Sequence, residues 1–316
     1  MSWRPVAPAH CTGAAEGLAL GGPVVSRTRL GLSLLSTLLV SSSPAFGWAD
    51  VGHQVVCEIA FQELTGAVKK AVERLVETHP DFSTFPEACT WPDRPGGERK
   101  DEHYNNVSRD SDQIRTEACH MADRCLFTAI RKDSGEVSDE SRSDQERAEA
   151  LAYLGHWIGD LHQPLHVAFK DDKGGNDVQE SGSACSGNLH LVWDLCIIDR
   201  MLGSDSRAIA RSLHGEITSS DRDEWLDSTV VGWADESYEI TISQQVGYCV
   251  KEGGACWYEA NRARLDPTAA KKTVPVDQTY IDVQLPIVRK RLQKAGIRLG
   301  GLLNDLFGRT GTRIEP

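Results

Sequence analysis

The segment HWIGDLHQPLH, residues 156–166, contains three histidines and one aspartate. His156 and Asp160 are four residues apart, so on a helix they share one face and can bind one ion together. Pro164 removes a backbone donor and crowds the preceding turn, which predicts that the helix ends or kinks there and turns His166 toward the same cavity. The segment therefore predicts a metal site at the end of a helix.

A second pair with the same spacing follows in NLHLVWD, where His190 and Asp194 are again four residues apart. The glycine turn GGN, residues 174–176, lies between the two pairs. A single pair of this kind is more often a solvated helix face or a core histidine, but two pairs around a glycine turn favour a metal centre. Imidazole and carboxylate ligands without a thiolate suit Zn2+ best, and Mn2+ and Fe2+ are alternatives.

The first 47 residues resemble a leader. Two arginines precede the apolar run Leu30 to Val40, and small residues follow it in 41–47. This order predicts a secretory signal rather than a membrane span, with cleavage after Gly47. The mature chain would begin at Trp48, whose freed amine and carbonyl can chelate a metal, with His53 as a third ligand.

The mature chain is strongly acidic. The leader carries three arginines and one glutamate, so its removal takes the formal net charge from −12 to −14 at pH 7. This charge excludes polyanion binding through a broad basic face. An anionic substrate would have to be held by local charge, which several divalent ions in one pocket would supply.

Of the nine cysteines, Cys11 lies in the leader, which leaves an even number in the mature chain. An even number in an exported chain predicts disulfides, up to four of them. The simplest pairs are Cys119 with Cys125 and Cys249 with Cys256.

Helical periodicity dominates the mature chain, and alternating strands are scarce. We expect helices in an amphipathic run from Val55 to Val76, broken near Thr65-Gly66, and in a long final segment from Tyr280 to Phe307, kinked or delimited by Pro286. Residues 197–225 and 230–246 are also expected to be helical, 249–273 a less regular insertion, and the charged stretch 132–147 a solvated link. The prediction is one mostly helical, all-α domain over residues 48–316.

Two loop residues are further candidate ligands. Asp93 closes the sequence Trp-Pro-Asp, and His103 precedes Tyr104, whose ring could stack on a ligand. The remaining candidates are expected to be surface or core residues, with the tryptophans shielding the site: His79, His120, His214, Trp157 and Trp193.

Seven motifs occur in order along the mature chain: an amino-terminal Trp with a His five residues later, WPD, HY, HxxxDxHQPLH, GGN, NLHxxWD and AGxRLxxLLN. Together they resemble the zinc-dependent single-strand-specific nucleases of fungi, plants and bacteria. The resemblance runs from Trp48 to Phe307 and implies the all-α fold that these enzymes share with the bacterial zinc phospholipases C.

The resemblance implies three zinc ions. The first would be held by Asp93, His103, His156 and Asp160, the second by Trp48, His53 and a bridging Asp160, and the third by His166, His190 and Asp194. The attacking water would be activated by ions held on Asp160 and Asp93, without a side-chain nucleophile. His162 is not implied as a ligand and is expected to orient a ligand or its neighbourhood.

The implied activity is endonucleolytic hydrolysis of single-stranded DNA and RNA to 5'-phosphorylated nucleotides, with a second activity as a 3'-nucleotidase. The implied setting is secreted or periplasmic, with nucleic acid and nucleotide substrates, no membrane and no obligate protein partner. One alternative is a zinc phospholipase C, in which the last carboxylate ligand is typically Glu rather than the Asp194 of this chain. The other is a non-catalytic zinc-binding protein that has lost substrate access.

The substrate-binding residues implied by the resemblance are Tyr104, Asn106 and Arg94. Base stacking on Tyr104 would explain a preference for single strands, and the fungal enzymes carry Phe there. Asn106 stands where the fungal enzymes have a base-contacting Asp, Leu195 where they have Asn, and Arg94 two residues before the position of their Arg. These departures affect substrate contacts and leave the implied ligands intact.

Overall fold

The computed structural model describes residues 48–94, 99–119, 123–252, 255–257 and 273–308. The predicted leader with its cleavage point, His120 and most of the predicted 249–273 insertion lie outside the described residues. All the described residues belong to one compact unit, Pro44–Pro316.

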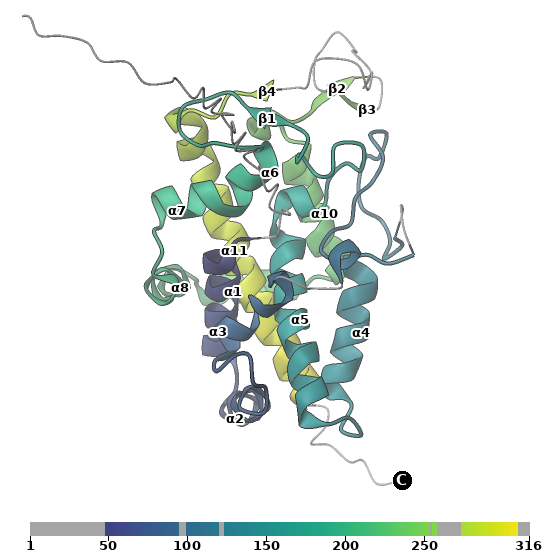
Figure 1. The fold of residues 1–316 in the computed structure, drawn as a ribbon, viewed down its shortest axis with the longest axis vertical. Helices are drawn as coiled ribbons and strands as arrows, with labels where there is room; N and C mark the ends of the chain where they lie inside the picture. Colours follow the sequence, from purple (N-terminus) through teal and green to yellow (C-terminus); the bar gives the residue numbers. More distant parts are fainter. Residues whose placement is uncertain (1–47, 95–98, 120–122, 253–254, 258–272, 309–316) are drawn as a thin grey trace, which may run out of the picture. The chain divides into compact units, whose positions relative to one another are not determined.

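Helices account for most of the described residues, which confirms the predicted all-α class (Figure 1). In chain order they are α1 Asp50–Glu63, α2 Gly66–Val76, α3 Phe85–Ala88, α4 Leu126–Ser138, α5 Asp144–His162, α6 Leu189–Leu191, α7 Ile197–Met201, α8 Ser206–Gly215, α9 Ser219–Leu226, α10 Val230–Thr241 and α11 Gln278–Gly308. The described strands are two or three residues long: β1 Gln179–Glu180 pairs in parallel with β4 Thr273–Val274, and β2 Val250–Glu252 pairs antiparallel with β3 Ala255–Trp257. Among the described residues, no helix combines the length and the hydropathy that a membrane crossing requires.

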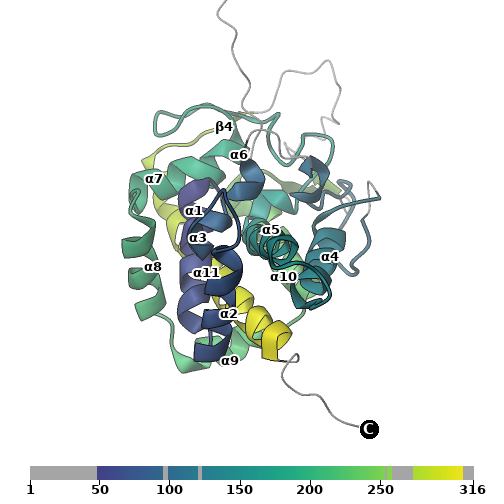
Figure 2. The ribbon, with the colours of Figure 1, turned by 60° about the horizontal axis from the view of Figure 1, so that its bottom comes forward.

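The long helix α11 lies between α1 and α5 and packs against both (Figures 1 and 2). Glycine permits the close approach of α11 to α1, because a Cβ at Gly296 would lie 2.4 Å from Ile59 Cγ2. Pro286 is inside α11, which continues from Gln278 to Gly308, so it does not delimit the helix. Burial of the helix on both sides of the proline stabilises the continuous element.

The predicted break near Thr65 is confirmed, because α1 ends at Glu63 and the Thr65 hydroxyl accepts a hydrogen bond from Val68 N at the start of α2. The prediction of a solvated link over 132–147 is wrong for most of its length. α4 continues to Ser138 and α5 begins at Asp144, so the non-helical part is short. Most of the charges lie on the outer face of α4, and its buried face is apolar except for Asp133.

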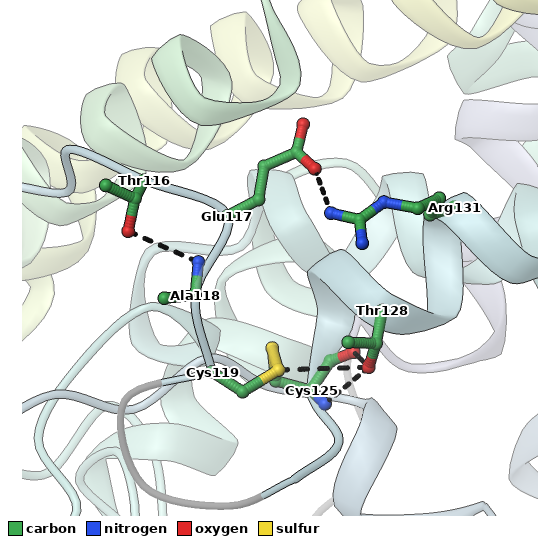
Figure 3. The surroundings of a disulfide bond; sticks show 7 residues. All are labelled: Thr116, Glu117, Ala118, Cys119, Cys125, Thr128 and Arg131. Carbon is green, nitrogen blue, oxygen red and sulfur yellow. Dashed lines mark hydrogen bonds and ion pairs between the residues drawn. A yellow bond between two sulfur atoms is a disulfide. The ribbon is translucent and has the colours of Figure 1, made fainter.

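Four disulfides are present among the described residues: Cys57–Cys89, Cys119–Cys125, Cys185–Cys196 and Cys249–Cys256. The two predicted pairs are therefore confirmed. Cys125 lies at the amino-terminal end of α4, where the Thr128 hydroxyl bonds the Cys125 backbone (Figure 3). Leu126 N donates to the carbonyl of Tyr104 at 3.3 Å, so this helix end also holds the loop that carries Tyr104.

Candidate metal centre

Helix α5 presents the first predicted ligand pair, His156 and Asp160, at its carboxyl end. The helix begins at a capping box between Ser143 and Glu146 and ends at His162, two residues before the proline, as predicted. His156 Nε2 lies 3.3 Å from Asp160 Oδ2, and both side chains are wholly buried. The spacing of four residues therefore places the two side chains together as expected.

Two loops bring Asp93 and His103 to this pair. Asp93 ends the 3-10 turn Trp91–Asp93, and its Oδ1 lies 3.4 Å from His156 Nε2. His103 Nδ1 lies 3.0 Å from the same nitrogen and 3.1 Å from Asp160 Oδ2. Ring nitrogens and carboxylate oxygens from α5 and two loops thus converge on one point, an arrangement that suits a bound cation.

The loop that precedes His103 is held by a buried ion pair. Arg99 donates from both terminal nitrogens to Asp133 on α4, at 3.0 and 2.7 Å, and from Nε to Glu102 at 2.6 Å. Trp157 Nε1 donates to the same Asp133 carboxylate at 2.6 Å. The buried carboxylate of Asp133 therefore joins the loop before His103 to Trp157, the neighbour of His156. The sequence pattern predicts a solvated link at this position, which is wrong.

His53 comes from α1 and reaches the other oxygen of Asp160. His53 Nε2 lies 3.4 Å from Asp160 Oδ1. Neither ring nitrogen of His53 has a hydrogen-bond partner, and Asp160 Oδ1 has none either. Leaving buried polar atoms unsatisfied costs about 1–3 kcal/mol each, so His53 and Asp160 together are a candidate binding site for a cation.

Trp48 lies beside the same region. Its side chain is wholly buried, and Ala49 N donates to the backbone carbonyl of Asp194 at 3.0 Å. A Cβ on Gly159 would lie 3.7 Å from Trp48 Cδ1 and 2.7 Å from His53 Nδ1. The start of the predicted mature chain is thus next to α5 and to the second histidine–aspartate pair.

The third group consists of His166, His190 and Asp194. His190 Nε2 lies 3.1 Å from His166 Nε2 and 3.2 Å from Asp194 Oδ2, an oxygen without a hydrogen-bond partner. Asp194 belongs to a π-helical turn, Val192–Cys196, between α6 and α7. Such turns are rare and are often found at functional sites.

Three of the imidazoles are oriented by backbone carbonyls. His156 Nδ1 lies 2.8 Å from the carbonyl of Cys89, His190 Nδ1 2.6 Å from that of Gly174, and His166 Nδ1 2.5 Å from that of His103. A ring that donates from Nδ1 carries its free electron pair on Nε2, which faces the other ligand atoms. Sequence reasoning missed Cys89 and Gly174, because a carbonyl acceptor leaves no mark on residue type.

Gln163 is another residue that sequence reasoning missed. It donates from Nε2 to Asp194 Oδ1, and its own oxygen accepts from Leu165 N. Gln163 therefore aims the Asp194 carboxylate while it shapes the turn before His166. The sequence signal that could have identified Gln163 is its place in the HQPLH motif, between Asp160 and His166.

In the first group, neighbouring residues shift the pKa values of His156 and Asp160 in opposite directions. Burial lowers the pKa of His156, but Asp160 and Asp93 outweigh it and raise that pKa well above the ordinary value. Burial raises the pKa of Asp160, but His156 and His166 outweigh it and hold that pKa well below the ordinary value. The carboxylate is thus kept charged, as a cation ligand must be.

The third group is electrostatically different. Burial raises the pKa of Asp194 well above its ordinary value. Burial, together with His166, lowers the pKa of His190 to about 3. Burial thus favours neutral imidazoles on His166 and His190, as ligands of a cation must be, whereas Asp194 would have to release its proton when a cation binds.

The ring of His162 faces away from all three groups. Its Nδ1 donates to the carbonyl of Ile158 at 2.8 Å, and its Nε2 lies 3.0 Å from Arg298 Nη1. Burial, with Arg291 and Arg298, lowers the pKa of His162 well below its ordinary value. The ring contacts α11 rather than a ligand atom.

The three predicted substrate-binding residues lie in different surroundings. Tyr104 is 38% exposed, and its hydroxyl is 3.3 Å from Asp101 Oδ1. Asn106 is buried, with its side-chain oxygen unsatisfied. Arg94 donates to the carbonyl of Asp81 at 2.7 Å, so its guanidinium has a protein partner. Tyr104 and Arg94 are therefore both exposed, whereas Asn106 is buried.

The residues expected to be ordinary are packed as predicted where the structure describes them. Trp157 and Trp193 are wholly buried. His79 is buried and stacks on Phe82, and His214 lies 2.5 Å from Glu63 in an ion pair at the surface of α8.

The sequence of this chain matches a known family. The family model described as S1/P1 Nuclease matches residues 48–308. "Endonuclease 2" of Arabidopsis thaliana is 28% identical over 289 residues, which cover 86% of this chain and 94% of that protein. "Nuclease P1" of Penicillium citrinum is 28% identical over 197 residues, 58% of this chain and 67% of that protein. "Nuclease S1" of Aspergillus oryzae is 24% identical over 283 residues, 86% of this chain and 96% of that protein.

Proposed function

Because this chain belongs to the S1/P1 nuclease family, we propose that it is a zinc-dependent endonuclease that hydrolyses single-stranded DNA and RNA to 5'-phosphorylated nucleotides. A second activity as a 3'-nucleotidase is part of the proposal. The observation that carries it is the presence of three buried groups of potential ligands: His53, His156 and Asp160; Asp93, His103 and His156; and His166, His190 and Asp194. Within each group the ligand atoms lie within 4.8 Å of one another.

The donor set fits zinc. Imidazole nitrogens and carboxylate oxygens without thiolate suit Zn2+, and the unsatisfied His53 nitrogens and Asp160 Oδ1 are explained by a cation. The proposed ligands are Asp93, His103, His156 and Asp160 for one ion, Trp48, His53 and Asp160 for another, and His166, His190 and Asp194 for the third. Bound zinc supplies Lewis acidity and lowers the pKa of water toward about 7.

The residues of this chain would divide the remaining work. Asp160 and Asp93 would supply negative charge between the ligand groups. The carbonyls of Cys89, Gly174 and His103 each hold one imidazole in a fixed orientation. The exposed ring of Tyr104 would stack on an unpaired base. A paired base is already stacked within the duplex, so it cannot stack on this ring. Asn106 and Arg94 are proposed as further substrate contacts.

The site also bears on processing and location. We propose that residues 48–316 form the enzyme after removal of the leader 1–47, because only then does Trp48 gain a free amine. Four disulfides fit an oxidising compartment, so a secreted or periplasmic enzyme is proposed.

The deciding experiment uses protein with Trp48 at its amino terminus. Single-stranded RNA and phosphatidylcholine are supplied in parallel, each with zinc and with a chelator. Release of nucleotides that the chelator abolishes would support the nuclease. Lipid cleavage alone would instead indicate a phospholipase C, and bound zinc without turnover of either substrate would indicate a zinc-binding protein.

A further inference from the structure

The carboxyl end of α5 is held by side chains from α10 and α11 that belong to none of the three ligand groups. The last carbonyls of a helix lack donors within the helix and need partners elsewhere. Ser237 Oγ on α10 lies 2.5 Å from the carbonyl of Leu161. Arg291 Nε on α11 donates to the carbonyl of His162 at 3.0 Å. Two neighbouring helices therefore complete the end of α5.

Thr241, the last residue of α10, holds the turn that follows. Its hydroxyl lies 2.5 Å from the carbonyl of Pro164 and 3.2 Å from that of Val167. These two carbonyls flank the turn Pro164–His166, and Thr241 is wholly buried. The hydroxyl has one hydrogen, and the carbonyl of Ser237 on its own helix also lies 3.1 Å away, so Thr241 donates to the nearest acceptor, Pro164, at the start of the turn that carries the predicted ligand His166.

A charge cluster of two buried arginines and the partly exposed Glu236 lies behind these contacts. Glu236 on α10 accepts from Arg291 Nη1 at 2.6 Å and from Arg298 at 2.7 and 2.8 Å. Arg291 and Arg298 are both buried, and Arg298 also holds the His162 ring. Cations at a helix carboxyl end interact favourably with its dipole, and a paired carboxylate removes the penalty of burying them.

The anchored segment connects two predicted ligands, Asp160 and His166. Between them, Gln163 donates to the carboxylate of Asp194. The direction in which the chain leaves α5 therefore sets the positions of Gln163 and His166 at once. An error in this direction would displace His166 from His190, whose Nε2 lies 3.1 Å away.

We propose that Ser237, Thr241 and the Arg291–Glu236–Arg298 cluster form a clamp that positions His166 and Gln163 in the third ligand group. We call these five residues the α5 clamp. Ser237, Thr241, Arg291 and Arg298 contact backbone carbonyls or the His162 ring, and Glu236 contacts the two arginines. All five are therefore positioning residues. This inference rests on the proposed function in one respect, namely that the third group binds zinc.

The test uses two mild substitutions with matched controls. Thr241→Val removes the hydroxyl at nearly constant volume, and Thr78→Val is its control, because Thr78 makes the same kind of bond to the Leu75 carbonyl at the end of α2. Arg298→Lys retains the positive charge but loses the planar guanidinium that bonds both Glu236 and His162. Its control is Arg289→Lys on the same helix, where Arg289 pairs with Glu216 at the surface. Zinc content is measured after dialysis against graded chelator, and hydrogen exchange is measured over residues 161–168.

We expect both clamp variants to lose one class of zinc at roughly tenfold lower chelator concentration and to exchange faster at 161–168, while the controls match wild type. A clamp variant with a lowered melting temperature but wild-type zinc affinity and wild-type hydrogen exchange would overturn the inference. It would show that these residues contribute to the stability of the fold and not to the position of His166. Neither measurement needs turnover. If wild-type protein binds zinc but hydrolyses no nucleic acid, the proposed function fails while the clamp is still tested.

Discussion

Nε2 of His53 lies 3.4 Å from Oδ1 of Asp160, and neither atom has a hydrogen-bond partner. The two residues are on different helices, α1 and α5. Their approach requires Gly159 on α5, because a Cβ there would lie 2.7 Å from His53 Nδ1. A glycine beside the predicted bridging aspartate thus decides whether α1 can supply a ligand.

Gly159→Ala should displace His53 and weaken binding of the ion that His53 shares with Asp160. Both side chains are wholly buried, so the added methyl has no space to enter without moving the ring. Zinc content by elemental analysis should fall, and hydrolysis of single-stranded RNA should fall with it. Gly135→Ala on α4 is the control, because nothing lies within 4 Å of its Cβ and alanine favours a helix by about 0.5–1 kcal/mol. Equal zinc content in the two variants would contradict this account of Gly159.

Tyr104→Ala should weaken substrate binding and leave zinc content unchanged. Stacking of a base on an aromatic ring contributes about 1–3 kcal/mol, so KM should rise by at least about fivefold. Tyr104→Phe keeps the ring and loses only the hydroxyl, which lies 3.3 Å from Asp101 Oδ1, so it should behave nearly as wild type. Unchanged kinetics of Tyr104→Ala would remove the stacking role.

Removal of the Cys57–Cys89 disulfide should affect both stability and metal binding. Cys57 lies one turn after His53 on α1, and the carbonyl of Cys89 orients His156. A crosslink that spans 32 residues restricts the unfolded chain and thereby raises the free energy of unfolding by about 3–4 kcal/mol. The double variant Cys57→Ala with Cys89→Ala should therefore melt at lower temperature and lose zinc more readily to a chelator.

The control for this disulfide is the double variant Cys249→Ala with Cys256→Ala, which opens a crosslink of only 7 residues between β2 and β3. It should lose less stability and retain wild-type zinc affinity. If both double variants lose zinc equally, the link between Cys89 and His156 is not the cause.

Glu236 should make stability depend on pH in the acid range. Burial raises the pKa of Glu236, but Arg298 and Arg291 outweigh it and lower that pKa from 4.5 to about 2. A depressed carboxyl pKa stabilises the folded state above the unfolded value, and the effect is lost as the pH falls through the folded value. The stability difference between wild type and Glu236→Gln should thus be full above about pH 4.5 and shrink toward pH 2.

Denaturant unfolding of zinc-free protein measures this difference without the effect of histidine ligands that release metal in acid. A difference between the two proteins that stays constant from pH 6 to pH 2 would show that the Glu236 carboxylate contributes nothing as a charge.

Local patterns predicted much of the fold because they act over a few residues. The break at Thr65, the end of α5 near Pro164 and two short-range disulfides were all readable in this way. Charge patterning misled over 132–138, because a helix with one polar face can still bury a carboxylate such as Asp133 when Arg99 and Trp157 satisfy it. Of the two effects predicted for Pro286, the end of the helix is wrong, since α11 continues past the proline, and the kink stays a prediction.

By itself, the sequence determined the two pairs His156 with Asp160 and His190 with Asp194, because helix geometry makes residues four apart neighbours. Residue spacing alone could not bring His53, from another helix, or His103, from a loop, to Asp160, because no local periodicity relates such distant positions. The family resemblance implied these meetings, and the tertiary structure shows them. Only the tertiary structure decided the contact of the Cys89 carbonyl with His156 and the clamp on α5, whose donors come from α10 and α11. Ligand identity is local chemistry, whereas ligand orientation depends on backbone carbonyls and buried charges that packing alone brings together.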